Sequence, residues 1–298
     1  MAFQIINPMK ITDLFDKNTF VLSSEVEPPK GTDIEKFINT AESLKNKVHF
    51  FNVTDQQGAV MHAGSLTGCT ILKNKNMEPI FQLACRDRNR IALQSDLLSA
   101  AISGLENVLI ITGDHPHLGD HPDARAVFDL DSVQLLQAAS KLMEGTDMAG
   151  NNLNKAPSFC LGAAVNPGAD NLDLELIKVE KKVRAGAKFF QTQAVFDPER
   201  FNDFMDRMKE FNTPVMAGIV ILKSSKMARF MNEKIAGISV PEEIIKRMEK
   251  TDDKKNESVE IAASIIRNIR SRCQGIHFMP LGWDNLVPGI LEKAGLTI

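Results

Sequence analysis

Short apolar runs alternate along the chain with amphipathic stretches, and this pattern predicts the secondary structure. Eight of the runs are rich in β-branched, aromatic and other apolar residues. They cover residues 20–28, 48–54, 79–85, 107–113, 158–165, 188–195, 214–221 and 275–281. Most of them follow one another at about thirty residues, a spacing typical of repeated strand–helix units. The gaps before the fifth and eighth runs are longer and predict additional loops or helices there.

The stretches between the runs have the periodicity of helices. Within residues 171–187 the apolar positions recur at helical spacing, and they are Leu172, Leu176, Val179 and Val183. Gly186 follows them, where the end of a helix favours a residue that tolerates positive φ. Farther along, we expect Ser239 to be the N-cap of a helix whose first turn holds Glu242 and Glu243. Residues 145–157 and 251–257 are expected to be loops.

Eight strands that alternate with helices over nearly the whole chain predict an α/β fold, a single-domain (β/α)8 TIM barrel. We expect residues 1–298 to form one barrel domain, with residues 1–19 as an N-terminal extension. The alternative is a doubly wound open sheet. Such a sheet usually carries a glycine-rich phosphate loop after its first strand, and the sequence EPPKG at 27–31 cannot serve as one.

The composition is that of an ordinary globular protein, and it narrows the classes of function. With 298 residues and a formal net charge of -3, the chain can form a large core and offers no basic surface for nucleic acid. The four cysteines show neither a CxxC motif nor metal-ligand spacing, so we expect reduced thiols. The N-terminal residues lack the pattern of a secretory signal, and no apolar run is as long as a membrane span. We therefore expect a soluble, cytoplasmic protein.

In a barrel of this kind the active site lies at the C-terminal ends of the strands. Nearly every predicted strand ends in polar residues, which are Glu25 and Glu27, Thr54 and Asp55, Gln82 and Arg86, Thr112 and Asp114, Asn166, Gln191 and Gln193, Lys223, and Trp283 with Asp284. Polar ends are common in any strand, so the polar residues within apolar runs are more informative. Glu25, Gln82, Gln191 and Gln193 are of this kind and would be costly to bury without partners.

Glu25 is the strongest candidate for acid chemistry. Because side chains alternate along a strand, Ser23, Glu25 and Glu27 share one face of the first strand. A carboxyl at a barrel mouth that is covered by a flat apolar ligand has its charged form disfavoured, which prepares it to act as a general acid. Asp114 follows Gly113, which lets a ligand approach the backbone closely. A second carboxylate there can stay ionised and bind donors on a substrate ring.

The loop DHPHLGDHPD, residues 114–123, suggests a metal site because it offers histidines and aspartates that zinc and similar ions use. A barrel hydrolase, however, draws its ligands from several strand ends, and the C-terminal ends of the other predicted strands hold no histidine, since His277 stands in the middle of its run. We therefore expect a solvated loop and no bound metal, and keep a metal-dependent barrel hydrolase as an alternative.

Five sequence motifs together resemble one known family. They are SSEVEPPKG, FQLACRDRNR, VLIITGDHP, VEKKVRAGAKFFQTQAVFD and AGIVIL, and they resemble, in order and spacing, the motifs of methylenetetrahydrofolate reductase. The resemblance runs from about Phe20 to the C-terminus. It implies a flavin-dependent (β/α)8 barrel that reduces 5,10-methylenetetrahydrofolate to 5-methyltetrahydrofolate.

The resemblance also implies roles for individual residues. Glu25 matches the catalytic acid that protonates N10 of the folate and opens its five-membered ring. Asp114 matches the aspartate near the flavin and the pterin, and Gln193 matches the glutamine that recognises the pterin. The positions that match flavin contacts are Thr54, Gln82, Thr112, Gly113, Asp114, Glu175, Lys178, Lys181 and Lys182. Lysines on one helical face suit a flavin phosphate, and a solvated cationic face is an equally common reason for them.

The chain departs from the family pattern at several positions, and these departures concern the electron donor. Family members often have an aromatic residue at Glu27, a histidine at Gln82 and an arginine at Thr112. The chain has no tyrosine, and no clear aromatic residue near Leu222 matches the one that stacks on a nicotinamide in some members. The resemblance thus implies a folate substrate, FAD or FMN as cofactor, and electrons from NAD(P)H or from a partner subunit in a homo- or hetero-oligomer. A catalytically quiet subunit of a larger redox complex is a further alternative.

Overall fold

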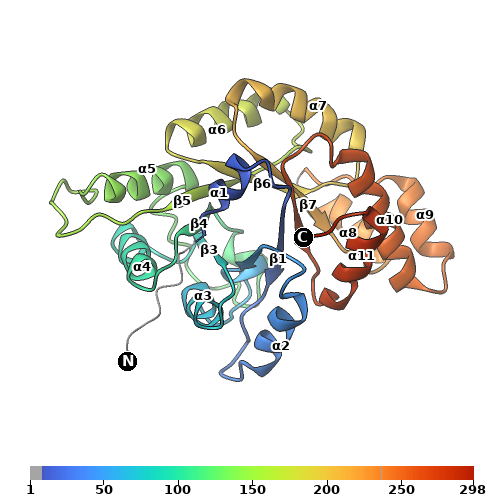
Figure 1. The fold of residues 1–298 in the computed structure, drawn as a ribbon, viewed down its shortest axis with the longest axis horizontal. Helices are drawn as coiled ribbons and strands as arrows, with labels where there is room; N and C mark the ends of the chain where they lie inside the picture. Colours follow the sequence, from blue (N-terminus) through green and yellow to red (C-terminus); the bar gives the residue numbers. More distant parts are fainter. Residues whose placement is uncertain (1–8, 236) are drawn as a thin grey trace.

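Eight parallel strands close into a barrel, and helices surround it (Figure 1). The structure is a computed structural model that describes residues 9–235 and 237–298. The strands pair in chain order and are β1 (Val21–Val26), β2 (Phe50–Val53), β3 (Pro79–Ala84), β4 (Asn107–Ile111), β5 (Cys160–Val165), β6 (Phe189–Ala194), β7 (Val215–Val220) and β8 (Gly275–Met279). Each predicted run contains one of these strands, and the (β/α)8 TIM barrel is confirmed.

Helices lie outside the barrel, between successive strands and after the last one (Figure 1). They are α2 (Glu35–Leu44), α3 (Ser65–Asn74), α4 (Arg90–Ile102), α5 (Ser132–Met143), α6 (Leu172–Arg184), α7 (Pro198–Met208), α8 (Ser225–Lys234), α9 (Glu242–Lys250), α10 (Lys254–Ile269) and α11 (Val287–Ala294), with short 3₁₀ turns η1 (Gln57–Ala59), η2 (Pro116–Leu118), η3 (Lys209–Phe211) and η4 (Asp284–Leu286). The long gap before β8 holds α8, α9 and α10, and the gap before β5 holds η2, α5 and the loop at 145–157. Gly186, just after the end of α6, has φ +111° as its position predicted.

Two local predictions were wrong, and both concern helix starts. The N-cap of α9 is Pro241 rather than Ser239, because the extended backbone of Pro241 (φ −57°, ψ 143°) leads directly into Glu242. Ser239 therefore stands too far before the first turn for its hydroxyl to cap it. The charged stretch 251–257 is only partly a loop, since α10 begins at Lys254 and Asp253 accepts a hydrogen bond from the Asn256 amide as its N-cap.

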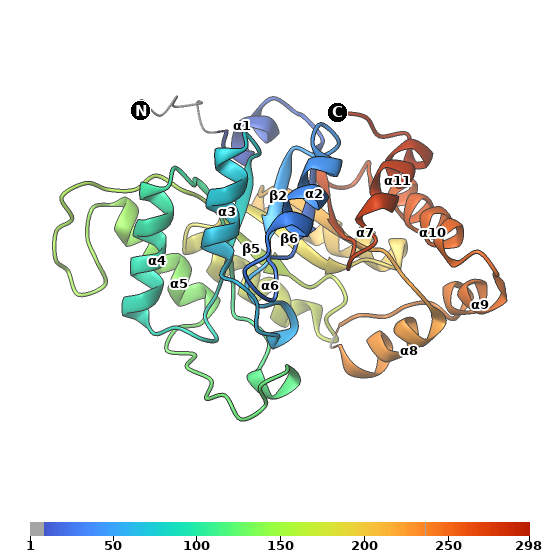
Figure 2. The ribbon, with the colours of Figure 1, turned by 90° about the horizontal axis from the view of Figure 1, so that it is seen from below.

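The lower half of the barrel interior is apolar and is closed by a short helix, α1 (Ile11–Asp16). Ile11 packs there against the inward-facing side chains Val21, Phe50, Ile80, Leu109, Cys160, Phe189 and Met216. The Ile11 amide donates to Asn107 Oδ1 at 2.8 Å, which fixes α1 to the start of β4. Residues 1–8 of the expected extension 1–19 lie outside the described residues. Figure 2 shows α1 on the side of the molecule opposite to the segment that follows β4.

The upper half of the interior, toward the C-terminal ends of the strands, is polar. Strand register and alternation direct inward Ser23, Glu25, Asn52, Thr54, Gln82, Gln191 and His277, all of which are buried. Gly162 lies between the two halves, where a Cβ would come within 2.2 Å of the Phe189 ring. A glycine at this position therefore makes room for the phenyl ring that helps to fill the apolar half. The polar half above it is where a barrel places its chemistry.

Candidate active site

Glu25 lies at the upper end of β1 and its carboxylate is held from two sides. The Gln57 amide Nε2 donates to Glu25 Oε2 at 3.0 Å, and His277 Nε2 lies 3.5 Å from Glu25 Oε1. Behind the imidazole, Ser23 Oγ lies 3.0 Å from His277 Nδ1. When the Ser23 hydroxyl donates to Nδ1, the proton of the neutral imidazole is on Nε2 and faces Glu25. The four residues form a connected array in which a proton can be held or passed.

A cleft of 780 Å³ opens beside Glu25 and gives it access to a ligand. Its walls are the loop after β1 (27–33), the start of α2 and the loop after β8 (280–284). Burial raises the pKa of the Asp284 carboxyl in this wall, and the negative charge of Glu25 acts in the same direction. Glu27 lies just beyond the end of β1, is exposed, and has His62 Nε2 at 3.6 Å. Glu25, within β1, and Glu27, just beyond it, therefore occupy different surroundings.

The loop after β2, which carries Gln57, has an unusual backbone. Gln56, Gly58 and Ala59 have φ angles of +47°, +62° and +59°. Two of these are not glycines, and such residues seldom adopt positive φ unless neighbouring groups hold them there. Arg86 supplies part of that support, since its Nη2 donates to the Gln56 carbonyl at 3.2 Å. The loop thus delivers the Gln57 amide to Glu25 in a strained conformation.

Asp114 is exposed at the mouth of the barrel, as is Thr112, and Gly113 between them has φ +88°. A Cβ at Gly113 would lie 3.2 Å from Arg86 Cβ. The Asp114 carbonyl accepts a hydrogen bond of 3.4 Å from Arg86 Nη1. The carboxylate of Asp114 is therefore presented to solvent on a turn whose backbone is fixed from below.

Gln193 reaches the mouth because β6 contains an irregularity. The register with β7 shifts between Gln191 and Ala194, and the Gly218 amide donates to Thr192 Oγ1 at 2.9 Å. A bulge of this kind re-aims the side chains that follow it. Gln193 is exposed, whereas Gln191 is 2% exposed and its amide has no hydrogen-bond partner among the described residues.

Thr54 and Gln82 lie deeper, below the mouth. The Thr54 side chain is buried, and within residues 9–235 and 237–298 its Oγ1 has no hydrogen-bond partner. Gln82 Oε1 accepts from the Asp55 amide at 2.9 Å. Asp55 is itself buried, and Arg88 binds its carboxylate through Nη1 and Nη2 at 2.7 and 3.1 Å. Gln82 thus contributes to the wall between β2 and β3, and Thr54 retains an unpaired hydroxyl that fits a polar ligand.

The four α6 residues matched to flavin contacts fall into two groups. Glu175 and Lys182 are buried and bound to the end of β5, where Glu175 accepts from the Asn166 amide at 2.9 Å and Lys182 Nζ donates to the Ala164 carbonyl at 2.6 Å. Burial also lowers the pKa of Lys182. Lys178 and Lys181 are exposed. Lys178 Nζ lies 3.5 Å from Glu175 Oε2, and both exposed lysines can present charge to a phosphate without losing the Lys182 contact of the barrel wall.

The histidine-rich loop forms a strap across the mouth. Asp120 pairs with Lys30 of the loop after β1, accepts from the Met61 amide at 3.0 Å, and lies 2.8 Å from His121 Nδ1. The hydrogen bond from Lys30 lowers the pKa of Asp120. In the described part of the chain no three His, Cys, Asp or Glu side chains are grouped so that they could hold a metal ion.

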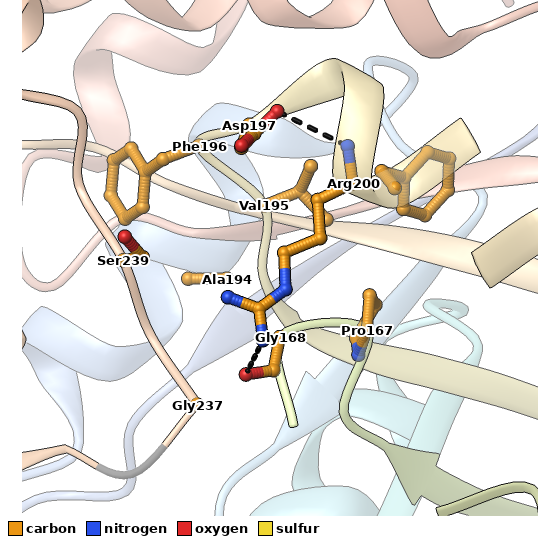
Figure 3. Close-up of a pocket in the computed structure, with 10 residues that line it drawn as sticks. Pro167, Gly168, Ala194, Val195, Phe196, Asp197, Arg200, Gly237 and Ser239 are labelled. Carbon is orange, nitrogen blue, oxygen red and sulfur yellow. Dashed lines mark hydrogen bonds between the residues drawn. The ribbon is translucent and has the colours of Figure 1, made fainter. Parts of the chain in front are cut away.

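A second pocket lies between the loops after β5 and β6 and the residues that follow α8 (Figure 3). Its volume is only 20 Å³, room for about one water. Arg200 closes it by donating to the Gly168 and Ala169 carbonyls at 2.8 and 2.9 Å. It is too small for a cofactor or a substrate.

Sequence reasoning missed four residues of the site: Ser23, Gln57 and His277 were not among the predicted site residues, and Arg86 was noted only as a strand end. The alternation of β1 had already placed Ser23 on the face of Glu25. His277 carried the same signal as Glu25, a polar residue in an apolar strand. Nothing in the sequence around Gln57 indicated that it contacts Glu25, because its position depends on the backbone conformation of its loop.

Three comparisons relate the chain to known proteins. The sequence profile of "Methylenetetrahydrofolate reductase" matches residues 10–295. The chain is 26% identical to methylenetetrahydrofolate reductase 2 of Schizosaccharomyces pombe over 97% of this chain and 48% of that protein. It is 24% identical to the 5,10-methylenetetrahydrofolate reductase of Pectobacterium carotovorum, covering 92% and 90% of the two chains. It spans about half the length of the yeast relatives it matches.

The structural comparison agrees on the fold. A Clostridium thermocellum protein described as binding two copies of 5-methyl-5,6,7,8-tetrahydrofolic acid superposes with a TM-score of 0.64 and 17% sequence identity, over 96% of this chain and 98% of that one. At this identity the likeness is one of fold. Among the described residues, no helix combines the length and apolar character needed to cross a membrane.

Proposed function

The chain belongs to the methylenetetrahydrofolate reductase family, and on that premise we propose that it reduces 5,10-methylenetetrahydrofolate to 5-methyltetrahydrofolate, a step of one-carbon metabolism, with a reduced flavin as hydride donor. The observation that carries the proposal is the Glu25 array at the upper end of the barrel. A buried carboxyl is fixed by Gln57, backed by His277 and Ser23, and open to a cleft of 780 Å³. This is the arrangement that a general acid requires.

Glu25 acts on the five-membered ring of the substrate. Its carboxyl proton goes to N10, and the bond between N10 and the methylene carbon breaks as that carbon becomes a cationic iminium with N5. Hydride addition to the methylene carbon then completes the methyl group. Gln57 keeps the Glu25 carboxyl oriented, His277 and Ser23 back it, and the cleft lets solvent return the proton to it. The exposed Asp114 and Gln193 would bind the donors and acceptors of the pterin edge.

A bound flavin, FAD or FMN, would supply the hydride. The residues proposed to hold it are Thr54, Gln82, Thr112, Gly113, Asp114, Glu175, Lys178, Lys181 and Lys182. Two observations suit a polar planar ligand here: the buried Thr54 hydroxyl lacks a partner in the described structure, and Gly113 presents backbone without a side chain. The charge for a flavin phosphate falls to the exposed Lys178 and Lys181, since Lys182 is engaged by Ala164.

The electron donor is proposed to be NAD(P)H or a partner subunit, in a homo- or hetero-oligomer. The departures from the family pattern favour the partner, because no clear aromatic residue near Leu222 matches the one that stacks on a nicotinamide in some members. Anaerobic titration decides between the two. Reduction of the bound flavin by NADH or NADPH supports the direct route. Failure of both nucleotides, with normal reaction of chemically reduced protein, supports the partner.

The test of the reaction uses full-length protein reconstituted with FAD or FMN and reduced with dithionite without oxygen. Addition of 5,10-methylenetetrahydrofolate should reoxidise the flavin, followed by its visible absorbance, and yield 5-methyltetrahydrofolate. If the protein takes up no flavin, or if the folate leaves the reduced flavin unchanged, the proposed function is wrong.

A further inference from the structure

Arg86 is a buried guanidinium that the proposed reaction does not use directly. It stands two residues beyond the end of β3 and is 2% exposed. Its Nε and Nη2 donate to the Asp87 carboxylate at 2.9 and 2.8 Å, so its charge is paired. Burying a charge is expensive even when it is paired. The contacts of the other Arg86 N–H donors therefore bear on why an arginine is buried at the mouth of this barrel.

The remaining donors of Arg86 reach two different loops. Nη2 donates to the Gln56 carbonyl at 3.2 Å, and Nη1 donates to the Asp114 carbonyl at 3.4 Å. The Gln56 carbonyl belongs to the peptide unit that leads into Gln57, whose side chain donates to Glu25. The Asp114 carbonyl fixes the turn that presents the Asp114 carboxylate. One side chain thus contacts the supports of both proposed active-site carboxylates.

The neighbouring Arg88 shows what a purely structural arginine looks like in this barrel. Its guanidinium binds the carboxylates of Asp55 and Asp96, and a longer contact reaches the Ala84 carbonyl. All of these belong to the walls formed by β2, β3 and α4. Arg86 instead binds carbonyls in the loops after β2 and β4, where Gln56 has a positive φ and needs support.

We propose that Arg86 is a positioning residue that sets the Gln57–Glu25 hydrogen bond and the Asp114 turn from a single guanidinium, so that the acid and the second carboxylate are placed together. Lysine cannot replace it, because one ammonium lacks the planar fork that reaches two carbonyls and a carboxylate at once. The catalytic consequence rests on the proposed function. The geometric consequence does not, and it can be measured on protein without flavin or folate.

The first experiment is hydrogen–deuterium exchange on full-length flavin-free protein, comparing wild type with Arg86→Met and Arg86→Lys. Loss of two bonds from a charged donor should make the amides of 56–61 and of 113–119 exchange at least about tenfold faster in both variants. The matched control is Arg90→Met, which removes an exposed arginine paired with Asp129. The control should leave 56–61 unchanged. If either segment of an Arg86 variant exchanges at the wild-type rate, the proposal is wrong.

The second experiment asks whether Arg86 acts through Gln57. In the folate assay we expect Arg86→Met to lower kcat more than it raises KM. The double variant Arg86→Met/Gln57→Ala should lose no more of kcat than the worse single variant, because both changes remove the same support of Glu25. Losses that multiply would indicate general damage to the fold and would overturn the proposal.

The two experiments separate this inference from the proposed function. If wild-type protein does not react with the folate, the proposed function fails, and the exchange pattern alone decides the role of Arg86. If wild type is active and the exchange of either segment is unchanged in Arg86→Met, the inference fails and the function stands.

Discussion

Replacing Glu25 by glutamine separates the chemistry of the site from its stability. The variant keeps the size and shape of the side chain but has no carboxyl proton to give. An amide oxygen can still accept from Gln57 Nε2, now 3.0 Å from the carboxylate, and the new NH2 can donate to His277 Nε2 when the imidazole proton moves to Nδ1 and is donated to Ser23 Oγ. Because both contacts can be kept, we expect a change of about 1 kcal/mol or less in the free energy of unfolding. That corresponds to a shift of about 2–4 °C in Tm.

The effect on the reaction should be far larger. Loss of a general acid typically lowers the rate by about 10²- to 10⁴-fold, or about 2.7–5.5 kcal/mol in the barrier. The assay follows the reoxidation of dithionite-reduced flavin by 5,10-methylenetetrahydrofolate in an anaerobic stopped-flow instrument. Thermal unfolding of the same samples and flavin absorbance serve as controls for folding and cofactor uptake. A variant that turns over folate within tenfold of wild type would refute the role of Glu25, because Glu25 supplies the one carboxyl of its array with Gln57, His277 and Ser23.

Three further predictions concern the barrel itself. Asp55→Ala should lower the free energy of unfolding by about 2–4 kcal/mol in urea titration, because it removes the buried carboxylate that accepts from the Arg88 guanidinium and the Ala84 amide, while Asp96 still pairs with Arg88; a loss below about 1 kcal/mol would contradict this. Gly162→Ala should cost about 1–3 kcal/mol by the same measurement, because the new methyl would meet the Phe189 ring, and an unchanged midpoint would show that the ring is free to move. The Arg90 guanidinium, which donates to the Asp129 carboxylate, lowers the pKa of that carboxyl from 3.8 to about 2. The contribution of this pair to the stability of the fold is therefore complete above the ordinary pKa and disappears as the pH falls to about 2. Acid unfolding curves of wild type and Asp129→Asn should therefore differ at pH 5 and converge near pH 2, and a constant difference would refute the assignment.

The strands and the principal acid could be predicted because both depend on local pattern. Parallel barrel strands are buried on both faces and appear as short apolar runs, so all eight were visible in the sequence. Glu25 was visible for the same reason, as a carboxyl within such a run. Alternation along β1 also placed Ser23 on the correct face, so the inner wall of the first strand followed from period two alone.

The partners of Glu25 could not be predicted because they depend on contacts distant in sequence. His277 faces Glu25 only when β8 pairs with β1 and closes the barrel in the observed register. Gln57 reaches it through positive φ at Gln56, which glutamine does not signal. The exposure of Gln193 depends on the irregular register of β6 with β7, for which the sequence has no marker. These features arise from tertiary packing, which overrides local preference.

The mistaken helix starts have a similar cause. Ser239 and Pro241 both match helix-start preferences, and only the backbone leading into Glu242 decides between them. In the charged stretch, Asp253 had the character of an N-cap. The density of charge at 251–257 concealed the first turn of a helix whose buried face begins later, at Ser258 and Val259.

The division of the barrel interior into an apolar lower half and a polar upper half bears on how this protein would respond to selection for heat resistance. Asn52 and Gln191 are buried in the upper half, and their amides have no hydrogen-bond partners within the described structure. Apolar replacements of similar size would remove that penalty, so a screen for survival at high temperature should accumulate changes at these two positions first. Substitutions in the lower half would add little stability, because apolar side chains such as Ile11 and Phe189 already pack there. Thermostable descendants would therefore tend to lose polar groups from the floor of the mouth, a common route by which robustness and activity come into conflict.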